Sequence, residues 1–325
     1  MSDDMSAGRI VAAVAALVIS APLAAQVRPL EYNASELVMM AVQGEIAPAT
    51  LSNPPYRIHP DGKLGVYPGT GGITYNFRTG DSAVKIAADH VEPAVSVYSL
   101  GKGDRGSSQN VAFNVLSCIG NEAIVVTGDA KGSSGWVIGK HGGAEHVMID
   151  FPNKVYDKLV IGDKILVRSI GTGMKLLNID GVAVMNMSPQ LMKALTDAGV
   201  GVTPQGTLHV PVTHRVPAKV MGSGLGRNHV YKGDYDIQLF DEKVVAEHNL
   251  ETLRFGDIVA ITDADHTYGR IYLTGAVSIG VVVHSRSWSA GHGPGVVTLF
   301  TSREGRIETE IDPDANLGKL LKIRH

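Results

Sequence analysis

The chain has 325 residues, a formal net charge of -3 and 44% hydrophobic residues, which is typical of a globular protein with one large or two medium-sized domains. No stretch carries a block of like charge, so the sequence excludes the cationic surface that nucleic-acid binding requires. The single cysteine, Cys118, excludes an internal disulfide and a zinc site built from several thiolates, and its apolar neighbours predict a buried, unreactive thiol.

Residues 1–30 form an apolar leader. An uncharged apolar run covers residues 10–24, with an arginine before it and small residues after it, and this pattern resembles a secretory signal peptide. Two acids near the start depart from that pattern, and an apolar helix at the start of the mature fold is the alternative. The run is too short to predict a membrane span. We therefore leave two locations open, which are the cytoplasm and, if residues 1–25 act as a signal, the periplasm.

After residue 30 the sequence is dominated by short runs rich in Val, Ile and Thr, which Gly, Asp, Asn or Pro separate. Such runs are typical of β-strands. They read GGITYNF, AIVVTG, GWVIGK, HVMIDF, DKILVRS, DIVAITD, GVVVHS and GVVTLF. The 38 glycines indicate many tight turns. We predict a mainly β protein (α+β at most) with two halves that resemble β-barrels or sandwiches, together with a few short helices.

Helical signals are few. One covers residues 34–42 (ASELVMMAV). A second begins at Ser188, which suits the N-cap, has Pro189 in its first turn and ends at Gly199. The segment FDEKVVAEHNLETL is expected to add one or two further helical turns.

A weak internal repeat supports a division into two halves. The segments LVIGDKILVRS (159–169) and LRFGDIVAITD (253–263) share a Gly-Asp turn followed by alternating apolar residues, although such turns are common. The capped helix at 188–199 lies between them. We therefore predict an N-terminal β domain at 31–187 and a C-terminal β domain at 188–325 that begins with this helix.

The segment GKHGGAEHVMIDF places two histidines five positions apart around a pair of glycines. Neither a helix nor a strand brings two side chains with that spacing to one face. A hairpin loop at 142–145 would instead make His141 and His146 cross-strand neighbours, with Cβ atoms about 5 Å apart. Two imidazoles at that distance suit a shared metal ion or anion. The alternative is that the glycines only form a turn.

The segment AADHVEPAVSV holds Asp89, His90 and Glu92 in otherwise apolar surroundings. Charged groups in such surroundings are costly unless they are paired, coordinated or exposed. Histidine and carboxylate ligands together suit zinc, manganese or iron. The alternative is an internal ion pair, for example His90 with Glu92 or with Arg57.

The C-terminal half holds further candidates. Arg270 and His284 lie in TDADHTYGRIYLTGAVSIGVVVHS, and His292 lies in the glycine-rich turn AGHGPGV, whose backbone N–H groups suit an oxyanion. Arg270 could hold a substrate carboxylate, although an exposed strand arginine is the commoner case. The segment KGDYDIQLFD adds Asp234 and Asp236. No P-loop, Rossmann motif or G-x-S-x-G elbow is found, so we expect no nucleotide cofactor and no serine nucleophile.

Several distinctive motifs follow one another in order between about residues 33 and 310. They are GEIAPATL, PGTGGITYN, GDSAV, ADHVEPAVS, GDAKGSSGWVIGKHGGAEHV, MGSGLG, GDYDIQLFDE and AGHGPGV. In this combination the sequence resembles the DUF4438 family. The chain departs from the family pattern at Ala94, where the family usually has glycine, in its apolar leader, and in the spacer HSRSWSAGHG, which often carries an acid. The resemblance implies a β-rich fold in two parts and leaves the function open.

These candidates favour a metal-dependent hydrolase that cleaves a small amide, cyclic amide or lactone with metal-activated water. One divalent transition metal, zinc, manganese or iron, is expected, and its predicted ligands are His141, His146, His90, Glu92 and Asp89. The predicted catalytic residues are Glu145 as general base, with His284, His292 and Arg270 across the site. The alternatives are a non-catalytic ligand-binding or assembly protein, and a metal-free isomerase or lyase that uses His and Asp. In each case we expect a small-molecule ligand and a homo-oligomer, because short strands leave edges that need cover.

Overall fold

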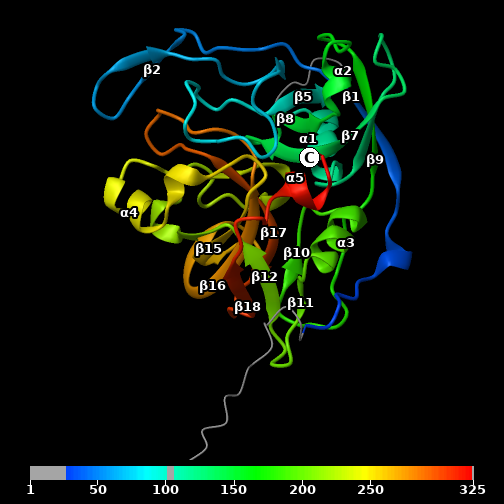
Figure 1. Ribbon diagram of the computed structural model, residues 1–325, viewed down its shortest axis with the longest axis vertical. Coiled ribbons are helices and arrows are strands. Elements are labelled where there is room, and N and C mark those ends of the chain that lie inside the picture. The colour runs from blue at the N-terminus through cyan, green and yellow to red at the C-terminus, as the bar shows by residue number, and fades with distance from the viewer. Residues whose placement is uncertain (1–26, 101–105, 324–325) are drawn as a thin grey trace, which may run out of the picture.

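The structure is a computed structural model that describes residues 27–100 and 106–323, so the signal-like run at 10–24 lies outside the described residues. Among the residues that are described, no helix is both long enough and apolar enough to cross a membrane. The fold is mainly β, as predicted, with two β-rich halves and short helices. Figure 1 shows the N-terminal strands in the upper part of the molecule and the C-terminal strands below them.

The N-terminal half contains a closed barrel of six antiparallel strands. In order around the barrel they are β1 (Met40–Ile46), β9 (Lys164–Ser169), β6 (Glu122–Val125), β7 (Ser134–His141), β8 (His146–Asp150) and β5 (Ala94–Ser99), and β5 pairs back to β1. Closure leaves no unpaired edge among these six strands. The short β4 (Ile73–Thr74) extends the sheet beyond β5, and β2 (Tyr56–Ile58) and β3 (Leu64–Val66) form a separate hairpin.

The C-terminal half contains a second sheet of six strands. Its order is β10 (Ala183–Val184), β17 (Gly295–Ser302), β16 (Ile271–Val282), β15 (Ile258–Asp265) and β13 (His214–Pro217), with β14 (Tyr235–Asp236) also paired to β17. A smaller sheet is formed by β11 (Gly201–Val202), β12 (Leu208–Val212) and β18 (Ile307–Ile311). The eight strand runs predicted from the sequence coincide with β4, β6, β7, β8, β9, β15, β16 and β17.

The helices are short. They are α1 (Ser108–Leu116), α2 (Asn153–Tyr156), α3 (Pro189–Asp197), α4 (Glu242–Glu247) and α5 (Leu317–Leu320), with 3-10 turns η2 (Ala34–Glu36), η3 (Ala218–Val220), η4 (Val230–Lys232) and η5 (Leu250–Thr252). The predicted capped helix is α3, where the Ser188 hydroxyl accepts a hydrogen bond from the Leu191 N–H. The helical turns predicted in FDEKVVAEHNLETL are α4 and η5. The sequence did not predict α1.

The helix predicted at 34–42 is wrong. Only η2 is helical there, and β1 begins at Met40 and runs through Val42 to Ile46. The backbone of β1 pairs with β9 along its length and with β5 at its end, which closes the barrel. These pairings to distant parts of the chain outweigh the local helical preference of the segment.

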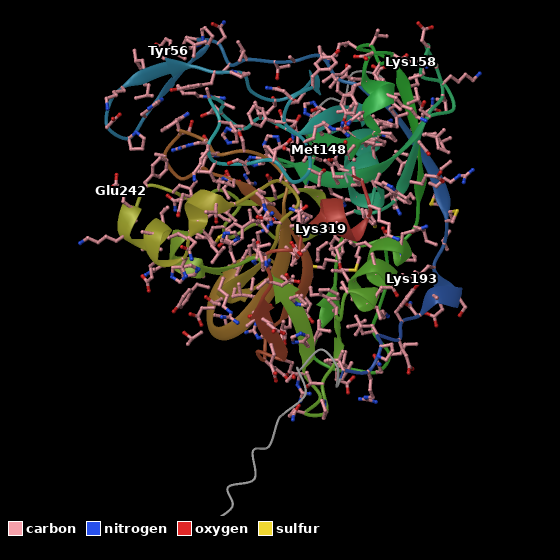
Figure 2. The ribbon with its side chains drawn as sticks, viewed as in Figure 1. Tyr56, Met148, Lys158, Lys193, Glu242 and Lys319 are labelled. Atoms are coloured by element: carbon pink, nitrogen blue, oxygen red, sulfur yellow. The ribbon has the colours of Figure 1, made fainter. Side chains whose placement is uncertain are left out.

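One hydrophobic core runs through both halves. It includes Val137 of the barrel and Leu299 of the C-terminal sheet. At Gly139 in β7, a Cβ atom would lie within 2.8 Å of the side chains of Val283 and Met148, so the absence of a side chain there lets the two halves approach closely. Figure 2 shows Met148 in the interior of the upper half. The segments that carry the candidate site residues meet at this junction between the halves.

Candidate metal centre

The hairpin between β7 and β8 brings His141 and His146 together, as their spacing predicted. The two residues are paired cross-strand neighbours at the end of β7 and the start of β8. Gly142 has φ 62° and Ala144 has φ 73°, which is the left-handed conformation that the tight loop requires. Both histidines are buried.

Glu92 is fully buried and contacts both of these histidines. Its Oε1 atom is 2.6 Å from His141 Nδ1, and its Oε2 atom is 2.9 Å from His146 Nδ1. Oε2 also accepts hydrogen bonds from the Gly71 N–H at 2.8 Å and the Ser96 hydroxyl at 2.5 Å. Although burial opposes ionisation, the two histidines hold the pKa of Glu92 well below its usual range. Because Glu92 binds Nδ1 of His141, the Nε2 atom of that ring is left for a ligand.

Asp89 and His90 form a second carboxylate–histidine pair. Asp89 Oδ1 is 2.7 Å from His90 Nδ1 and accepts from Arg57 Nε at 3.1 Å, while Oδ2 accepts from the Trp288 N–H at 2.8 Å. Although burial acts in the opposite direction, the hydrogen bonds from His90 and Trp288 lower the pKa of Asp89 to about 2. His90 has φ 58°, a strained conformation for a residue other than glycine, and its Nε2 lies 3.0 Å from His292 Nδ1.

Two aspartates reach the same place from the C-terminal half. Asp234 precedes β14 and Asp236 ends it, and the alternation of an extended chain turns both carboxylates to one side. Asp234 Oδ1 accepts from the Gly142 N–H of the hairpin loop at 2.9 Å. Asp236 Oδ2 lies 3.2 Å from His292 Nδ1. Although burial opposes ionisation, the neighbouring imidazoles of His284 and His292 hold the pKa of Asp236 far below its usual range.

His284 is fully buried, and its Nδ1 donates to the Ser285 carbonyl oxygen at 2.8 Å. Its Nε2 atom lies 2.6 Å from Asp234 Oδ2, but neither atom makes a hydrogen bond of acceptable geometry. Buried polar atoms without hydrogen bonds are rare, and two that face one space are expected of ligands to a cation. Although burial opposes a positive charge, Asp234 and Asp236 raise the pKa of His284 well above its usual range. A proton on this nitrogen would have to leave before a metal ion could bind there.

Gly295 keeps the space beside these two atoms open. A Cβ atom at this position would lie 2.2 Å from Asp234 Oδ2 and 2.3 Å from His284 Nε2. Gly295 begins β17 and pairs with Asp236 of β14, so its place is fixed by the sheet. Only glycine at this position leaves the two side chains where they are.

Six side chains thus form two neighbouring triads of potential metal ligands. The inner triad is His141, Asp234 and His284, all buried, and the outer triad is His90, Asp236 and His292, which is partly exposed. Within each triad, one ligand atom from each residue lies within 4.8 Å of the others. The triads are adjacent, because the ring centroids of His90 and His284 are only 5.2 Å apart.

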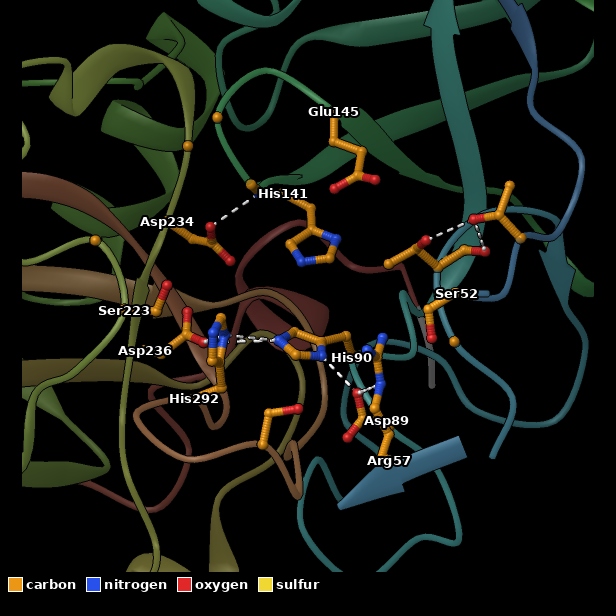
Figure 3. Close-up of a pocket in the computed structure, with 18 of the residues that line it drawn as sticks. Ser52, Arg57, Asp89, His90, His141, Glu145, Ser223, Asp234, Asp236 and His292 are labelled. Carbon is orange, nitrogen blue, oxygen red and sulfur yellow. Dashed lines mark hydrogen bonds and ion pairs between the residues drawn. The ribbon is translucent and has the colours of Figure 1, made fainter. Parts of the chain in front are cut away.

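A cavity of about 780 Å³ between the two halves is lined by the outer triad and by His141 and Asp234 of the inner triad. Figure 3 shows His141, His90 and His292 with Asp234 and Asp236 around this space, and Glu145 with its carboxylate directed toward it. The cationic side chains that line the cavity are those of Arg57, Arg227, Lys232 and Arg270.

Most of the predicted site residues lie at this cavity, either in the triads or directly behind them. His90, His141, His284 and His292 belong to the triads, whereas Asp89 and Glu92 bind the Nδ1 atoms behind them. His146 also contacts Glu92 and belongs to neither triad. The aspartates of the triads were noted in the sequence without a ligand role. Their D-x-D spacing, which directs two carboxylates to one side of an extended chain, is the signal that could have identified them.

Glu145 and Arg270 both line the cavity. Glu145 is half-buried in the hairpin loop. Arg270 is buried, so the alternative of an exposed strand arginine is wrong. Its Nη2 donates to the Gly233 carbonyl oxygen at 2.8 Å, so the guanidinium supports the chain just before Asp234.

Comparisons with known proteins give a family and a fold. Two family models, described as the N-terminal and C-terminal domains of unknown function DUF4438, match residues 56–193 and 198–321. A solved structure, "Crystal structure of TM1086", is 46% identical, with a TM-score of 0.82, and the alignment covers 89% of this chain and 98% of that chain. No curated protein matches the chain.

Proposed function

We propose a function from the site alone, because the chain belongs to the DUF4438 family, as its motifs predicted, and the family's description carries no activity. The protein is a metal-dependent hydrolase that cleaves a small amide, cyclic amide or lactone with activated water. Two buried atoms without hydrogen bonds, Asp234 Oδ2 and His284 Nε2, carry this proposal. With His141 they offer two imidazole nitrogens and one carboxylate oxygen, which is a donor set of catalytic zinc sites.

The residues around the inner triad are arranged to present ligand atoms to one ion. Glu92 keeps the proton of His141 on Nδ1, and the Ser285 carbonyl oxygen does the same for His284. The Gly142 N–H binds Asp234 Oδ1, which leaves Oδ2 for the ion. A divalent ion held by three protein ligands keeps a further position open, where it polarises a carbonyl group or lowers the pKa of water to about 7.

We assign the proton transfer to Glu145. It lies in the loop that joins the strands of His141 and His146, and its carboxylate points into the cavity in Figure 3. As general base it takes a proton from the attacking water while the water oxygen bonds to the carbonyl carbon. The bond from that carbon to the leaving nitrogen or oxygen then breaks, and the leaving group receives the proton from Glu145.

The cavity favours a small and polar substrate. Its volume of about 780 Å³ lies within the range of about 300–1,000 Å³ that is usual for small-molecule sites. Arg227 and Lys232 supply positive charge at its wall. Such a wall suits substrates that carry an anionic or strongly polar group beside the bond that is cleaved.

The test compares a glycine variant beside the inner triad with a glycine variant in the cavity wall. Gly295→Ala places a methyl group between Asp234 Oδ2 and His284 Nε2 without removing a ligand, whereas a Cβ atom at Gly143 meets no atom within 4 Å. The protein is produced with zinc, manganese and iron, purified without chelators, and analysed for metal. We expect at least one ion per chain in the wild type and in Gly143→Ala. In Gly295→Ala we expect at least a tenfold weaker affinity for zinc.

Hydrolysis is measured on acetamide, dihydrouracil and γ-butyrolactone, before and after removal of the metal. We expect turnover of at least one of these probes by the metal-loaded protein and its loss in the metal-free protein. A wild type without transition metal, or with equal turnover in both forms, overturns the proposal. Bound metal without turnover on any probe overturns the hydrolase and favours the ligand-binding alternative.

A further inference from the structure

We infer that the outer triad is a second metal site and that Asp236 bridges it to the inner triad, so that the protein holds a two-ion centre. The inference rests on the proposed metal role of the inner triad. The adjacent triads share the floor of one cavity, and their imidazoles lie close together, with His90 and His141 ring centroids 5.7 Å apart.

Asp236 is the residue that connects the triads, because each of its oxygens faces a different one. Oδ1 lies 3.6 Å from Nε2 of His284 in the inner triad. Oδ2 lies 3.2 Å from Nδ1 of His292 and 3.9 Å from Nε2 of His90 in the outer triad. A carboxylate with one oxygen on each of two ligand sets is placed as a bridge between ions, which lie about 3.5–4 Å apart in two-metal enzymes.

The outer triad turns three potential ligand atoms toward one another. Asp89 holds the proton of His90 on Nδ1, so the Nε2 atom of that ring presents a lone pair. That lone pair faces His292 Nδ1 at 3.0 Å, and Asp236 Oδ2 faces the same nitrogen. Asp236 Oδ2 also accepts a hydrogen bond from the Gly293 N–H at 3.2 Å. A cation that takes the place of the proton on His292 Nδ1 would bind all three atoms.

The exposure of the two triads gives the two ions different tasks. The inner triad is buried throughout, whereas His90 and His292 are partly exposed to the cavity. An ion held by the outer triad would lie nearer the open cavity and would polarise a carbonyl oxygen of the substrate there. With one ion on each side of the reacting group, both the attacking and the leaving oxygen of a lactone are stabilised.

The test counts ions and measures the distance between them. Equilibrium dialysis against zinc is expected to give two ions per chain in the wild type and one in His292→Ala, with at least a tenfold loss of affinity for the second ion. His229→Ala is the matched control, because His229 is an exposed histidine that lines the same cavity and belongs to neither triad. This variant is expected to keep two ions.

X-ray absorption on the zinc-loaded wild type is expected to show a metal–metal distance of about 3.5–4 Å. This measurement needs no variant, so it holds even if a substitution impairs folding. One ion per chain in the wild type, or two ions without a metal–metal signal, overturns the two-ion centre and leaves the hydrolase proposal standing. No ion at all overturns both.

Discussion

The histidines of this protein differ in protonation because their neighbours differ. Burial lowers the pKa of His90, whereas the carboxylates of Asp234 and Asp236 overcome burial and raise the pKa of His284. His266 is the extreme case away from the triads. It is fully buried with Nδ1 2.8 Å from the Thr298 hydroxyl, and burial, aided by the charge of Arg270, lowers its pKa to about 3.

The pKa of His266 predicts a loss of stability in mild acid. The unfolded chain binds a proton at this residue near pH 6.5, whereas the folded protein binds it only near pH 3. The contribution of neutral His266 to the free energy of unfolding is therefore complete above pH 6.5. It is lost as the pH falls toward 3, by up to about 1.4 kcal/mol per pH unit. Urea unfolding from pH 7 to pH 4 measures it. His266→Asn, which cannot titrate, should show a shallower decline, and the exposed His229→Asn should follow the wild type. Equal declines in wild type and His266→Asn would contradict the assignment.

The sequence predicts single residues well only where their roles depend on neighbours in the chain. The hairpin of His141 and His146 follows from two glycines and a spacing of five, which are local features. The roles of Asp234 and Glu92 do not follow from local features, because they depend on which histidine nitrogen each carboxylate contacts in the folded chain. Glu92 was expected as a ligand, and in the structure its carboxylate contacts the Nδ1 atoms of His141 and His146.

The turns of the sequence repeat, which the sequence identifies correctly, are set by short-range hydrogen bonds. The two copies of the sequence repeat have the same turn: Asp163 Oδ2 accepts from the Val160 N–H at 3.0 Å, and Asp257 Oδ2 accepts from the Arg254 N–H at 2.9 Å. Each turn leads into a strand, β9 or β15. The strand β1 was missed because its segment has a local helical preference, which its pairing with β9 and β5 outweighs.

Lys140 of β7 connects three elements through one buried ammonium group. Its Nζ donates to the carbonyl oxygen of Val115 in α1 at 3.2 Å, to Asn186 Oδ1 at 2.9 Å and to the carbonyl oxygen of Tyr231 in η4 at 3.0 Å. Burial lowers the pKa of Lys140 to about 8, so the cost of the buried charge offsets part of this contribution. The three hydrogen bonds fix the end of α1 and the segment before Asp234.

Lys140→Met keeps the length of the side chain and removes the donor. Each acceptor left without a donor costs about 1–3 kcal/mol, and relief of the buried charge offsets part of the total, so we expect a net loss of about 2–4 kcal/mol. Urea unfolding at pH 7 measures the change. The control is Lys164→Met. The Lys164 side chain is half-exposed with its ammonium group 3.7 Å from Glu45, and its replacement should change stability by less than about 0.5 kcal/mol. A Lys140→Met protein as stable as the wild type would show that the three hydrogen bonds contribute nothing.

At the scale of the whole molecule, the site exists only because two halves meet. His90 and His141 come from the N-terminal half, and the remaining members of the triads come from the C-terminal half. The sequence predicted two β-rich halves and most of the histidines. It could not predict which side chains of one half face those of the other half, since that depends on how the barrel packs against the second sheet.

The tip of the β7–β8 hairpin holds the halves in register. The Ala144 N–H donates to the Lys232 carbonyl oxygen at 2.8 Å, and the Gly142 N–H donates to Asp234. At Gly233 a Cβ atom would lie 1.7 Å from the Gly142 carbonyl oxygen. The φ of Gly233 is 172°, which any residue adopts, so a substitution there tests the contact and not the backbone conformation.

Gly233→Ala should therefore push the hairpin away from the chain that carries Asp234. We expect a loss of about 1–3 kcal/mol in the free energy of unfolding, as for other overpacked positions, and a fall of at least tenfold in zinc affinity because Asp234 Oδ2 moves relative to His284. Urea unfolding and equilibrium dialysis measure the two effects on one sample. Gly143→Ala, in the same loop contact region but with open space around its Cβ atom, should change neither. Lower stability with unchanged zinc affinity would show that the hairpin supports the fold without placing the ligand atoms, because the ligand set then survives the loss of its contact with Gly142.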